Sequence, residues 1–123
     1  MKKVDIKNSS FVINDNASIQ QAMEEITDNQ RGTVIVIDDK FYLGGVVSDG
    51  EIRRAMVEGI TTVAPVSKIM NTNPTVLSVK EYKSGKADEI FNDKNDIEIL
   101  PVVDENNKLI DIAVRNLGKR KEI

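Results

Sequence analysis

The sequence predicts an α+β fold made of two similar halves that pack together through their sheets. Residues 34–48 (VIVIDDKFYLGGVVS) align with residues 100–114 (LPVVDENNKLIDIAV) at an offset of 66 without a gap. In each copy an apolar, β-branched run leads through a polar turn into a second apolar run, which is typical of a strand hairpin. Because about 60 residues rarely hold a robust core alone, we expect the two copies to pack sheet to sheet.

A helix is predicted before each hairpin. The first covers 17–30, with Asn16 as its N-cap. Its apolar residues recur at helical spacing in one stripe: Ile19, Ala22, Met23 and Ile26. The second covers roughly 79–94, where Gly85 weakens the pattern. The alignment slips by one residue between this helix and its hairpin, so we expect a one-residue difference in that loop.

A short helix is predicted after the first hairpin, in EIRRAMVEG (51–59), and its counterpart would begin near Arg115. Each half is therefore β-α-β-β-α. We place the first repeat at 1–64 and the second at 65–123, with a truncated or degenerate last helix. The methionines at 23, 56 and 70 are interpreted as core residues.

Composition excludes several classes of function. The chain of 123 residues contains neither His nor Cys, which removes disulfides, thiolate catalysis, the commonest general base and the commonest transition-metal ligands. The acidic residues at 38–39 and 104–105 are interpreted as solvated turn residues, so no metal site is predicted. A net charge of −3 makes nucleic acid a poor partner. No run approaches the roughly 20 apolar residues that span a bilayer, and no signal peptide is evident, which predicts a cytoplasmic protein without membrane contact.

Specific motifs resemble those of the cystathionine-β-synthase (CBS) domain family. GVVSDGEIRRA (45–55) is similar to the family signature G-h-h-[ST]-x-x-[DN], VSKIMNTNPTVLS (66–78) to the linker between repeats, and ILPVVDENNKLIDI (99–112) to the second hairpin. The resemblance covers nearly the whole chain and implies a tandem CBS pair, or Bateman module, with pseudo-two-fold symmetry. DGEIRRA followed by VSKIMNTNP is similar to pairs attached to sugar-phosphate nucleotidyltransferases and to sugar-phosphate isomerases. We expect an N-terminal regulatory region of a nucleotidyltransferase, joined to a catalytic domain.

The stretch Ser48–Glu51 has two interpretations. Ser48 at the N-cap and Glu51 at N3 would form a capping box, which needs no ligand. The same strand-to-helix junction could bind a phosphate, because free N–H groups and the helix dipole point outward there. Gly50 would let a ligand approach the backbone. The predicted ribose and phosphate site is Ser48, Asp49, Gly50, Glu51, Arg53 and Arg54.

In the resembled family the residue at Ser48 contacts phosphate and the residue at Glu51 hydrogen-bonds the ribose. The family usually has Asp or Asn where this chain has Glu51. At offset 66 the same stretch becomes Val114–Leu117, without the hydroxyl and carboxylate, so at most one competent site is expected. By analogy with the family the weaker base-pocket candidates are Ile13, Val34, Ile35 and Thr75; the first three have plain core as the competing interpretation.

The resemblance therefore predicts a regulatory module that binds an adenine nucleotide, or another nucleotide, and requires no cofactor. A homodimer is expected, with exposed apolar residues such as Met56 and Ile60 at the interface. The alternative is a structural dimerisation module that no longer binds nucleotide. An enzyme is disfavoured, because only Ser48 beside carboxylates could serve as a nucleophile and it would be poorly activated.

Overall fold

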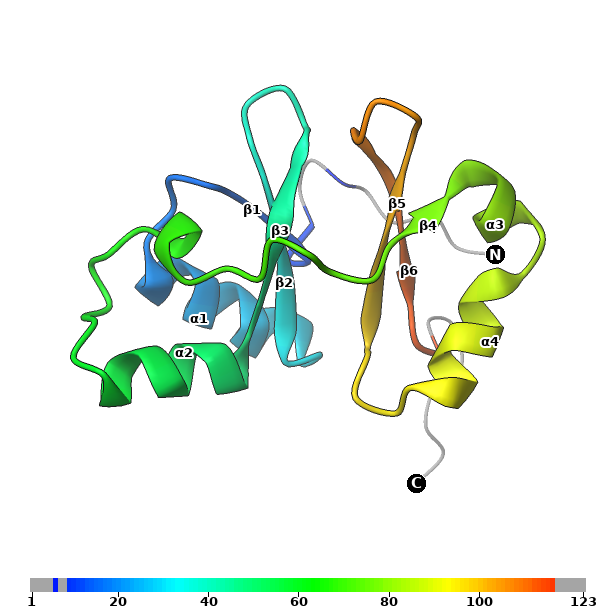
Figure 1. The fold of residues 1–123 in the computed structure, drawn as a ribbon. Coiled ribbons are helices and arrows are strands. Elements are labelled where there is room, and N and C mark those ends of the chain that lie inside the picture. Colours follow the sequence, from blue (N-terminus) through cyan, green and yellow to red (C-terminus); the bar gives the residue numbers. More distant parts are fainter. Residues whose placement is uncertain (1–5, 7–8, 117–123) are drawn as a thin grey trace.

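The computed structural model describes residue 6 and residues 9–116. It has two three-stranded sheets that face each other, with helices on the two outer sides (Figure 1). The first half contains β1 (Val12–Asn14), α1 (Ile19–Asn29), β2 (Thr33–Ile37), β3 (Leu43–Ser48) and α2 (Asp49–Val57). The linker contains the short 3-10 helix η1 (Val66–Lys68). The second half contains β4 (Leu77–Ser78), α3 (Val79–Lys83), α4 (Lys86–Asp93), β5 (Ile99–Val103) and β6 (Leu109–Val114). None of the described helices is long and apolar enough to cross a bilayer.

The offset of 66 is reproduced in both hairpins. Strands β2 and β3 map onto β5 and β6 without any shift of bounds, and β1 and β4 add a parallel strand to each sheet. The two turns are also alike, since Asp38 accepts backbone N–H groups at Lys40 and Tyr42, and Asp104 does so at positions 106 and 108. The interpretation of these carboxylates as turn residues is confirmed.

The two halves meet through their sheets with pseudo-two-fold symmetry. Leu43 N–H donates to the Asn107 carbonyl and Leu109 N–H donates to the Phe41 carbonyl, at 3.0 and 2.8 Å. These bonds are equivalent under the offset of 66. Between the sheets lies a buried cluster drawn from both halves: Ile35, Ile37, Ile99, Leu109, Ile112 and Val114. The predicted sheet-to-sheet pseudo-dimer is therefore confirmed.

Each half also has its own core between its sheet and its helices. In the first half this core holds Ile19, Ala22, Ile26, Val34, Val36, Val47 and Ile52. Val66 of η1 is fully buried in the same core, so the start of the linker packs on the first half, although our predicted boundary assigns it to the second. In the second half the core holds Leu77, Phe91, Leu100, Val102 and Ala113.

The helix starts differ from the prediction. Asn16 is not an N-cap: α1 begins two residues later, because Ser18 accepts from Gln21 N–H and Gln21 accepts from Ser18 N–H in a capping box. Ser78 and Glu81 form the same box at α3. The predicted continuous helix 79–94 is wrong, since Gly85 adopts φ 87° and separates α3 from α4.

Two further expectations are corrected. The loop between helix and strand has three residues in the first half (30–32) and five in the second (94–98), a difference of two rather than one. Met23 and Met56 are not core residues, because 37% and 45% of their surface is exposed on α1 and α2. Met70 is partly buried and packs against the first core. The expected second copy of α2 beyond Asn116 lies outside the described residues.

Candidate functional site

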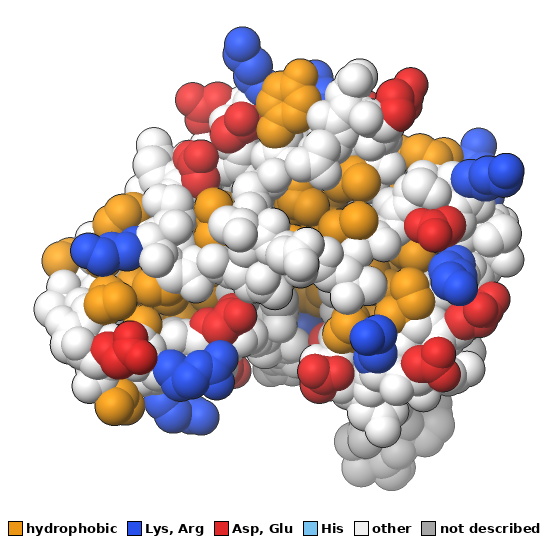
Figure 2. All heavy atoms as spheres, in the orientation of Figure 1, with side chains coloured by type: hydrophobic (Ala, Val, Ile, Leu, Met, Phe, Trp, Pro, Cys, Tyr) orange, Lys and Arg blue, Asp and Glu red, His pale blue; other side chains and the backbone are white. Residues whose placement is uncertain are grey.

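A cleft of about 340 Å³ lies between the two halves. Its walls come from the β3–α2 junction, from the linker and from the loop before β5. The lining residues are Thr33, Val46, Ser48, Glu51, Asn71, Asn73, Pro74, Thr75, Lys94, Asp96, Ile97, Glu98 and Ile99. In Figure 2 the molecule is notched between its two lobes, with acidic and basic side chains on both sides of the notch. The volume lies at the lower end of the usual range for small-molecule sites.

The first wall is the junction at which β3 ends and α2 begins. The capping box is present: Ser48 N–H donates to Glu51 Oε1 at 2.9 Å, and Glu51 N–H donates to Ser48 Oγ at 3.3 Å. Asp49 N–H donates to the Gly32 carbonyl. Three N–H groups of this junction, those of Ser48, Asp49 and Glu51, are therefore occupied. What remains for a ligand is the hydroxyl proton of Ser48 and the second carboxylate oxygen of Glu51, and both residues line the cleft.

The second wall is the linker, which crosses β3 in an extended conformation. Val46 and Asn71 exchange both backbone hydrogen bonds, at 3.1 and 2.8 Å. The crossing is close because Gly45 has no side chain: a Cβ there would collide with the Asn71 carbonyl. Beyond the crossing the chain brings Asn73, Pro74 and Thr75 to the cleft. This wall supplies amide and hydroxyl groups beside a proline ring.

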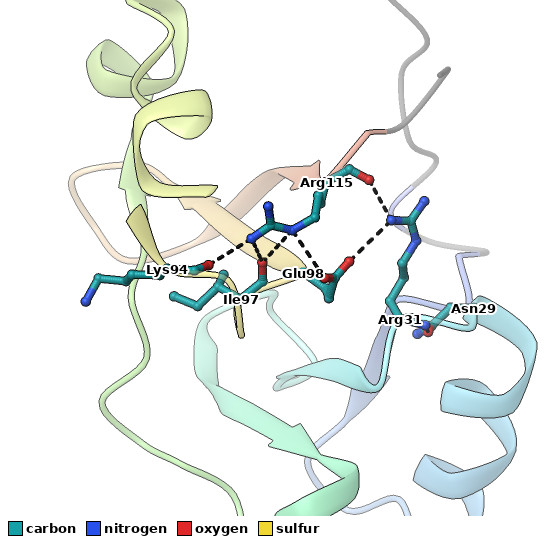
Figure 3. Close-up of polar contacts among 6 residues, drawn as sticks. All are labelled: Asn29, Arg31, Lys94, Ile97, Glu98 and Arg115. Carbon is teal, nitrogen blue, oxygen red and sulfur yellow. Dashed lines mark hydrogen bonds and ion pairs between the residues drawn. The ribbon is translucent and has the colours of Figure 1, made fainter. Parts of the chain in front are cut away.

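The third wall is the loop 94–98 between α4 and β5. Lys94 and Asp96 are exposed, whereas Ile97 and Glu98 are half-buried. Glu98 forms ion pairs with Arg115 at 3.2 Å and with Arg31 at 3.5 Å (Figure 3). These arginines do not line the cleft, so Lys94 is the basic side chain among its described lining residues. The cleft thus combines one lysine with the carboxylates of Glu51, Asp96 and Glu98. The charge of Glu98 is already balanced by its two ion pairs.

The structure separates the predicted site residues. Ser48, Glu51 and Thr75 line one cleft, although they come from different halves. Asp49 and Arg53 instead line a groove between α1 and α2, and Arg54 is exposed. Gly50 is half-buried on the first turn of α2 and does not line the cleft.

The three apolar base-pocket candidates lie in the core. Ile13 and Val34 pack under the helices of the first half, and Ile35 packs between the sheets. Their exposed fractions are 8%, 0% and 0%, so none reaches the cleft surface in this conformation. The apolar groups that do line the cleft are Val46, Pro74, Ile97 and Ile99.

Sequence reasoning missed most of the second and third walls. Lys94, Asp96 and Glu98 lie in a polar stretch, NDKNDIE, that reads as an ordinary loop. One signal was available: Thr33 and Ile99 are equivalent at the offset of 66, and both lie at the start of the central strand on the cleft. The loops that precede these two strands, 30–32 and 94–98, could therefore have been predicted to lie near the cleft.

A second concave surface lies on the outer side of the first half. The α1–α2 groove consists of two adjoining hollows of about 450 and 490 Å³ that share Met23 and Thr27. Its apolar members include Met56 and Val57, with 45% and 83% of their surface exposed. Among the described residues no three acidic side chains converge in the way a metal ion requires.

Comparisons with known proteins agree on one family. The family model described as "CBS domain" matches residues 3–58. Arabinose 5-phosphate isomerase GutQ of Escherichia coli is 39% identical over 93 residues, which are 76% of this chain and 28% of that protein. The chain thus spans less than a third of the curated relative it matches.

Solved structures share the fold over almost the whole chain. The CBS-pair protein CBSX2 of Arabidopsis thaliana is 26% identical with a TM-score of 0.69, covering 93% of this chain and 85% of its own. The CBS domain protein PAE2072 of Pyrobaculum aerophilum, solved in complex with AMP, is 19% identical with a TM-score of 0.69, covering 98% and 88%. CBSX2 has also been solved in complex with AMP.

Proposed function

Because this chain is a tandem CBS domain pair, we propose that it is a regulatory module that binds one adenine nucleotide in the cleft between its repeats. The observation that carries the proposal is the convergence of Ser48, Glu51 and Thr75 on a single cleft of about 340 Å³. The sequence predicts all three as nucleotide-binding residues, and they come from both repeats. The AMP complexes of CBSX2 and PAE2072 support the choice of ligand.

The lining groups suit the three parts of a nucleoside monophosphate. The carboxylate of Glu51 would accept hydrogen bonds from ribose hydroxyls, and the hydroxyls of Ser48 and Thr75 would donate to the phosphate. Lys94 would supply the cation. The base would lie against the apolar groups that line the cleft: Val46, Pro74, Ile97 and Ile99.

One ligand per chain is expected. The positions equivalent to Ser48 and Glu51 are Val114 and Leu117, which offer neither a hydroxyl nor a carboxylate, and Asp49 is replaced by Arg115. Arg115 is instead occupied by Glu98 and by backbone carbonyls. A titration should therefore saturate at one nucleotide per chain.

The module would act on a linked catalytic domain. The isomerase relative is much longer than this chain, which favours a sugar-phosphate isomerase as the linked enzyme. The comparisons do not support the nucleotidyltransferase that we expected. A ligand can bias such a domain only by its differential affinity for two states, typically about 1–3 kcal/mol.

Thermal unfolding with a nucleotide panel tests the proposal. AMP, ADP, ATP, GTP and CMP would each be added to the purified chain. At 100 times its Kd a ligand stabilises the folded state by about 2.7 kcal/mol, which is a midpoint shift on the order of 10 °C for this size. AMP is expected to give the largest shift. If no nucleotide shifts the midpoint, the nucleotide proposal is wrong.

The three capping boxes allow cap and ligand effects to be separated. Ser18→Ala, Ser48→Ala and Ser78→Ala each remove one N-cap hydroxyl, and each should lower the free energy of unfolding by about 1 kcal/mol. Only Ser48 lines the cleft, so only Ser48→Ala should also weaken AMP binding, measured by calorimetry. Equal AMP affinity in all three variants would reduce Ser48 to a structural cap.

The carboxylate of Glu51 can be tested in the same way. The capping box of α1 has a glutamine, Gln21, at the N3 position that Glu51 occupies in α2. The substitution Glu51→Gln should therefore still close the capping box of α2. It replaces an acceptor-only carboxylate by an amide that is a poorer acceptor for two ribose hydroxyls. We expect roughly tenfold weaker AMP binding, from the loss of about 1.4 kcal/mol, with little change in urea stability. AMP affinity equal to that of the unmodified chain would remove Glu51 from the site.

A second function is favoured by the α1–α2 groove. The apolar side chains of Met23, Met56 and Val57 are exposed together there, and a second copy of the chain is the expected occupant. If the module dimerises without binding nucleotide, sedimentation should show self-association and the nucleotide panel no shift. Met56→Glu would place a charge in the contact and should yield a monomer. A chain that is monomeric at all concentrations would exclude this dimer.

A further inference from the structure

Arg115 holds the loop that forms the third wall of the cleft. Its guanidinium donates to the Ile97 carbonyl at 2.6 and 3.1 Å and to the Lys94 carbonyl at 2.8 Å (Figure 3). It pairs with Glu98 at 3.2 Å and lies over the ring of Phe91, 4.9 Å from the centroid. All of these partners belong to α4 or to the segment 94–98. Because four contacts converge on one planar group, little freedom remains to Arg115 or to the backbone that it binds.

The contact also determines how α4 ends. Lys94 is the C-cap residue of α4, and its carbonyl belongs to the last turn, where a helix leaves acceptors without an internal partner. The Lys94 carbonyl also accepts from Ile97 N–H at 3.2 Å, so the guanidinium adds a second, charged donor at the negative end of the helix dipole. Arg115, the residue that follows β6, therefore caps the C-terminal end of α4, and the cleft wall begins at the residue that it caps.

The equivalent loop of the first repeat is held by other means. There the three-residue turn is held by the buried last residue of α1, because Asn29 donates to the Ser10 and Thr33 carbonyls and accepts from Arg31 N–H. The second-repeat loop is two residues longer, and Asn95 within it is exposed. The backbone bond from Arg115 N–H to the Glu98 carbonyl repeats the one from Asp49 to Gly32, but only Arg115 adds a side-chain clamp.

We propose that Arg115 is a positioning residue for the nucleotide site: by binding the carbonyls of Lys94 and Ile97, it holds the 94–98 wall in the conformation that binds ligand. The proposal rests on the proposed function, because it concerns the same cleft. Arg115 does not line the cleft, so its effect on the ligand passes through the backbone of Lys94, Asp96 and Ile97. The repeat that has lost its own Ser and carboxylate thus supports the site of the other repeat.

Arg31 provides the matched control. It belongs to the first repeat and reaches the same cluster, through an ion pair with Glu98 and a hydrogen bond to the Arg115 carbonyl. It makes no contact with the Lys94 or Ile97 carbonyls in the described structure. Arg31→Gln therefore removes an arginine of similar burial and leaves the clamp on the loop intact. Arg115→Gln and Arg31→Gln therefore differ in whether the side-chain bonds to the Lys94 and Ile97 carbonyls are lost.

The experiment compares Arg115→Gln, Arg115→Lys and Arg31→Gln. AMP binding would be measured by calorimetry, and backbone hydrogen exchange of 94–98 would be measured without nucleotide. Arg115→Gln should weaken AMP binding about tenfold, as a substitution that acts through intervening structure can. Arg115→Lys keeps the positive charge but loses the planar set of N–H donors that reaches both carbonyls, so it should resemble Arg115→Gln. Arg31→Gln should leave AMP affinity within about twofold, and only the Arg115 variants should raise exchange in 94–98.

The two readouts separate the two proposals. If the unmodified chain binds no nucleotide, the nucleotide proposal fails, and the exchange data still decide whether Arg115 holds the loop. If it binds AMP and Arg115→Gln binds equally well, the positioning role is wrong. Equal loss of affinity in the Arg31 and Arg115 variants would point to general destabilisation of the cluster and would also overturn it. If Arg115→Lys bound AMP as tightly as the unmodified chain, the positive charge alone would be sufficient, and the role of the bonds to the Lys94 and Ile97 carbonyls would be wrong.

Discussion

Replacing Gly45 by alanine is expected to destabilise the protein by about 3 kcal/mol. A Cβ at Gly45 would overlap the Asn71 carbonyl oxygen and lie 3.0 Å from its carbon, and both are backbone atoms that no rotamer change can move. The linker would have to lift from β3, which breaks the two backbone bonds between Val46 and Asn71. Overpacking typically costs about 1–3 kcal/mol, and each lost hydrogen bond adds about 1 kcal/mol. Urea denaturation measures the difference.

The neighbouring glycine is the control. A Cβ at Gly44 would lie 3.3 Å from Met70 Cε, which is the end of a flexible side chain that can turn aside. Gly44→Ala should therefore cost less than about 1 kcal/mol. Gly45→Ala should also weaken AMP binding, because the displaced linker carries Asn71 and Asn73 of the cleft. If the two variants were equally stable, the close crossing of the linker over β3 would be wrong.

The hairpins could be predicted from the sequence because the same pattern occurs twice, and each copy supports the interpretation of the other. A run such as TVIVI is ambiguous alone, but its recurrence as ILPVV, followed each time by a polar turn and a second apolar run, leaves the hairpin as the consistent interpretation. Helix starts were less predictable, because several polar residues before α1 can act as an N-cap. Asn14 accepts from Asn16 N–H in a local turn, and the N-cap is Ser18 instead.

The base-pocket candidates could not be placed from the sequence because β2 is buried on both faces. In a strand with one solvent-exposed face, the alternation of apolar and polar residues shows which side chains point inward. In β2 every residue from 34 to 37 is buried, so periodicity does not distinguish the faces. The structure resolves the alternation: Val34 faces the helices, and Ile35 faces the other sheet.

The first wall of the cleft was predictable and the third was not, for a physical reason. Ser48 and Glu51 are three residues apart and form a local motif whose geometry follows from the strand-to-helix junction. The 94–98 loop reaches the same cleft only through tertiary packing, with Glu98 and Arg31 in different repeats but 3.5 Å apart in space. Contacts of that kind have no periodicity, so they appear only when the two repeats are docked.

The two repeats are expected to unfold as one unit, and Ile35→Ala should show it. Ile35 is fully buried in the cluster that both sheets share, and shortening such a side chain to alanine costs about 2–5 kcal/mol. A repeat of about 60 residues buries a small share of its surface, so we expect neither repeat to remain folded alone. The loss should therefore appear as one transition in urea, with an unchanged m-value.

Native-state hydrogen exchange distinguishes cooperative from separate unfolding. In Ile35→Ala the slowest amides of β2 and of β5 should lose the same free energy of opening, although the substitution is in β2 alone. Ile110→Ala is the matched control, because Ile110 is 40% exposed and its truncation should cost less than about 0.5 kcal/mol. Loss of protection in the first sheet only would mean that each repeat is stable alone. The cleft, which needs walls from both repeats, would then depend on docking rather than on folding.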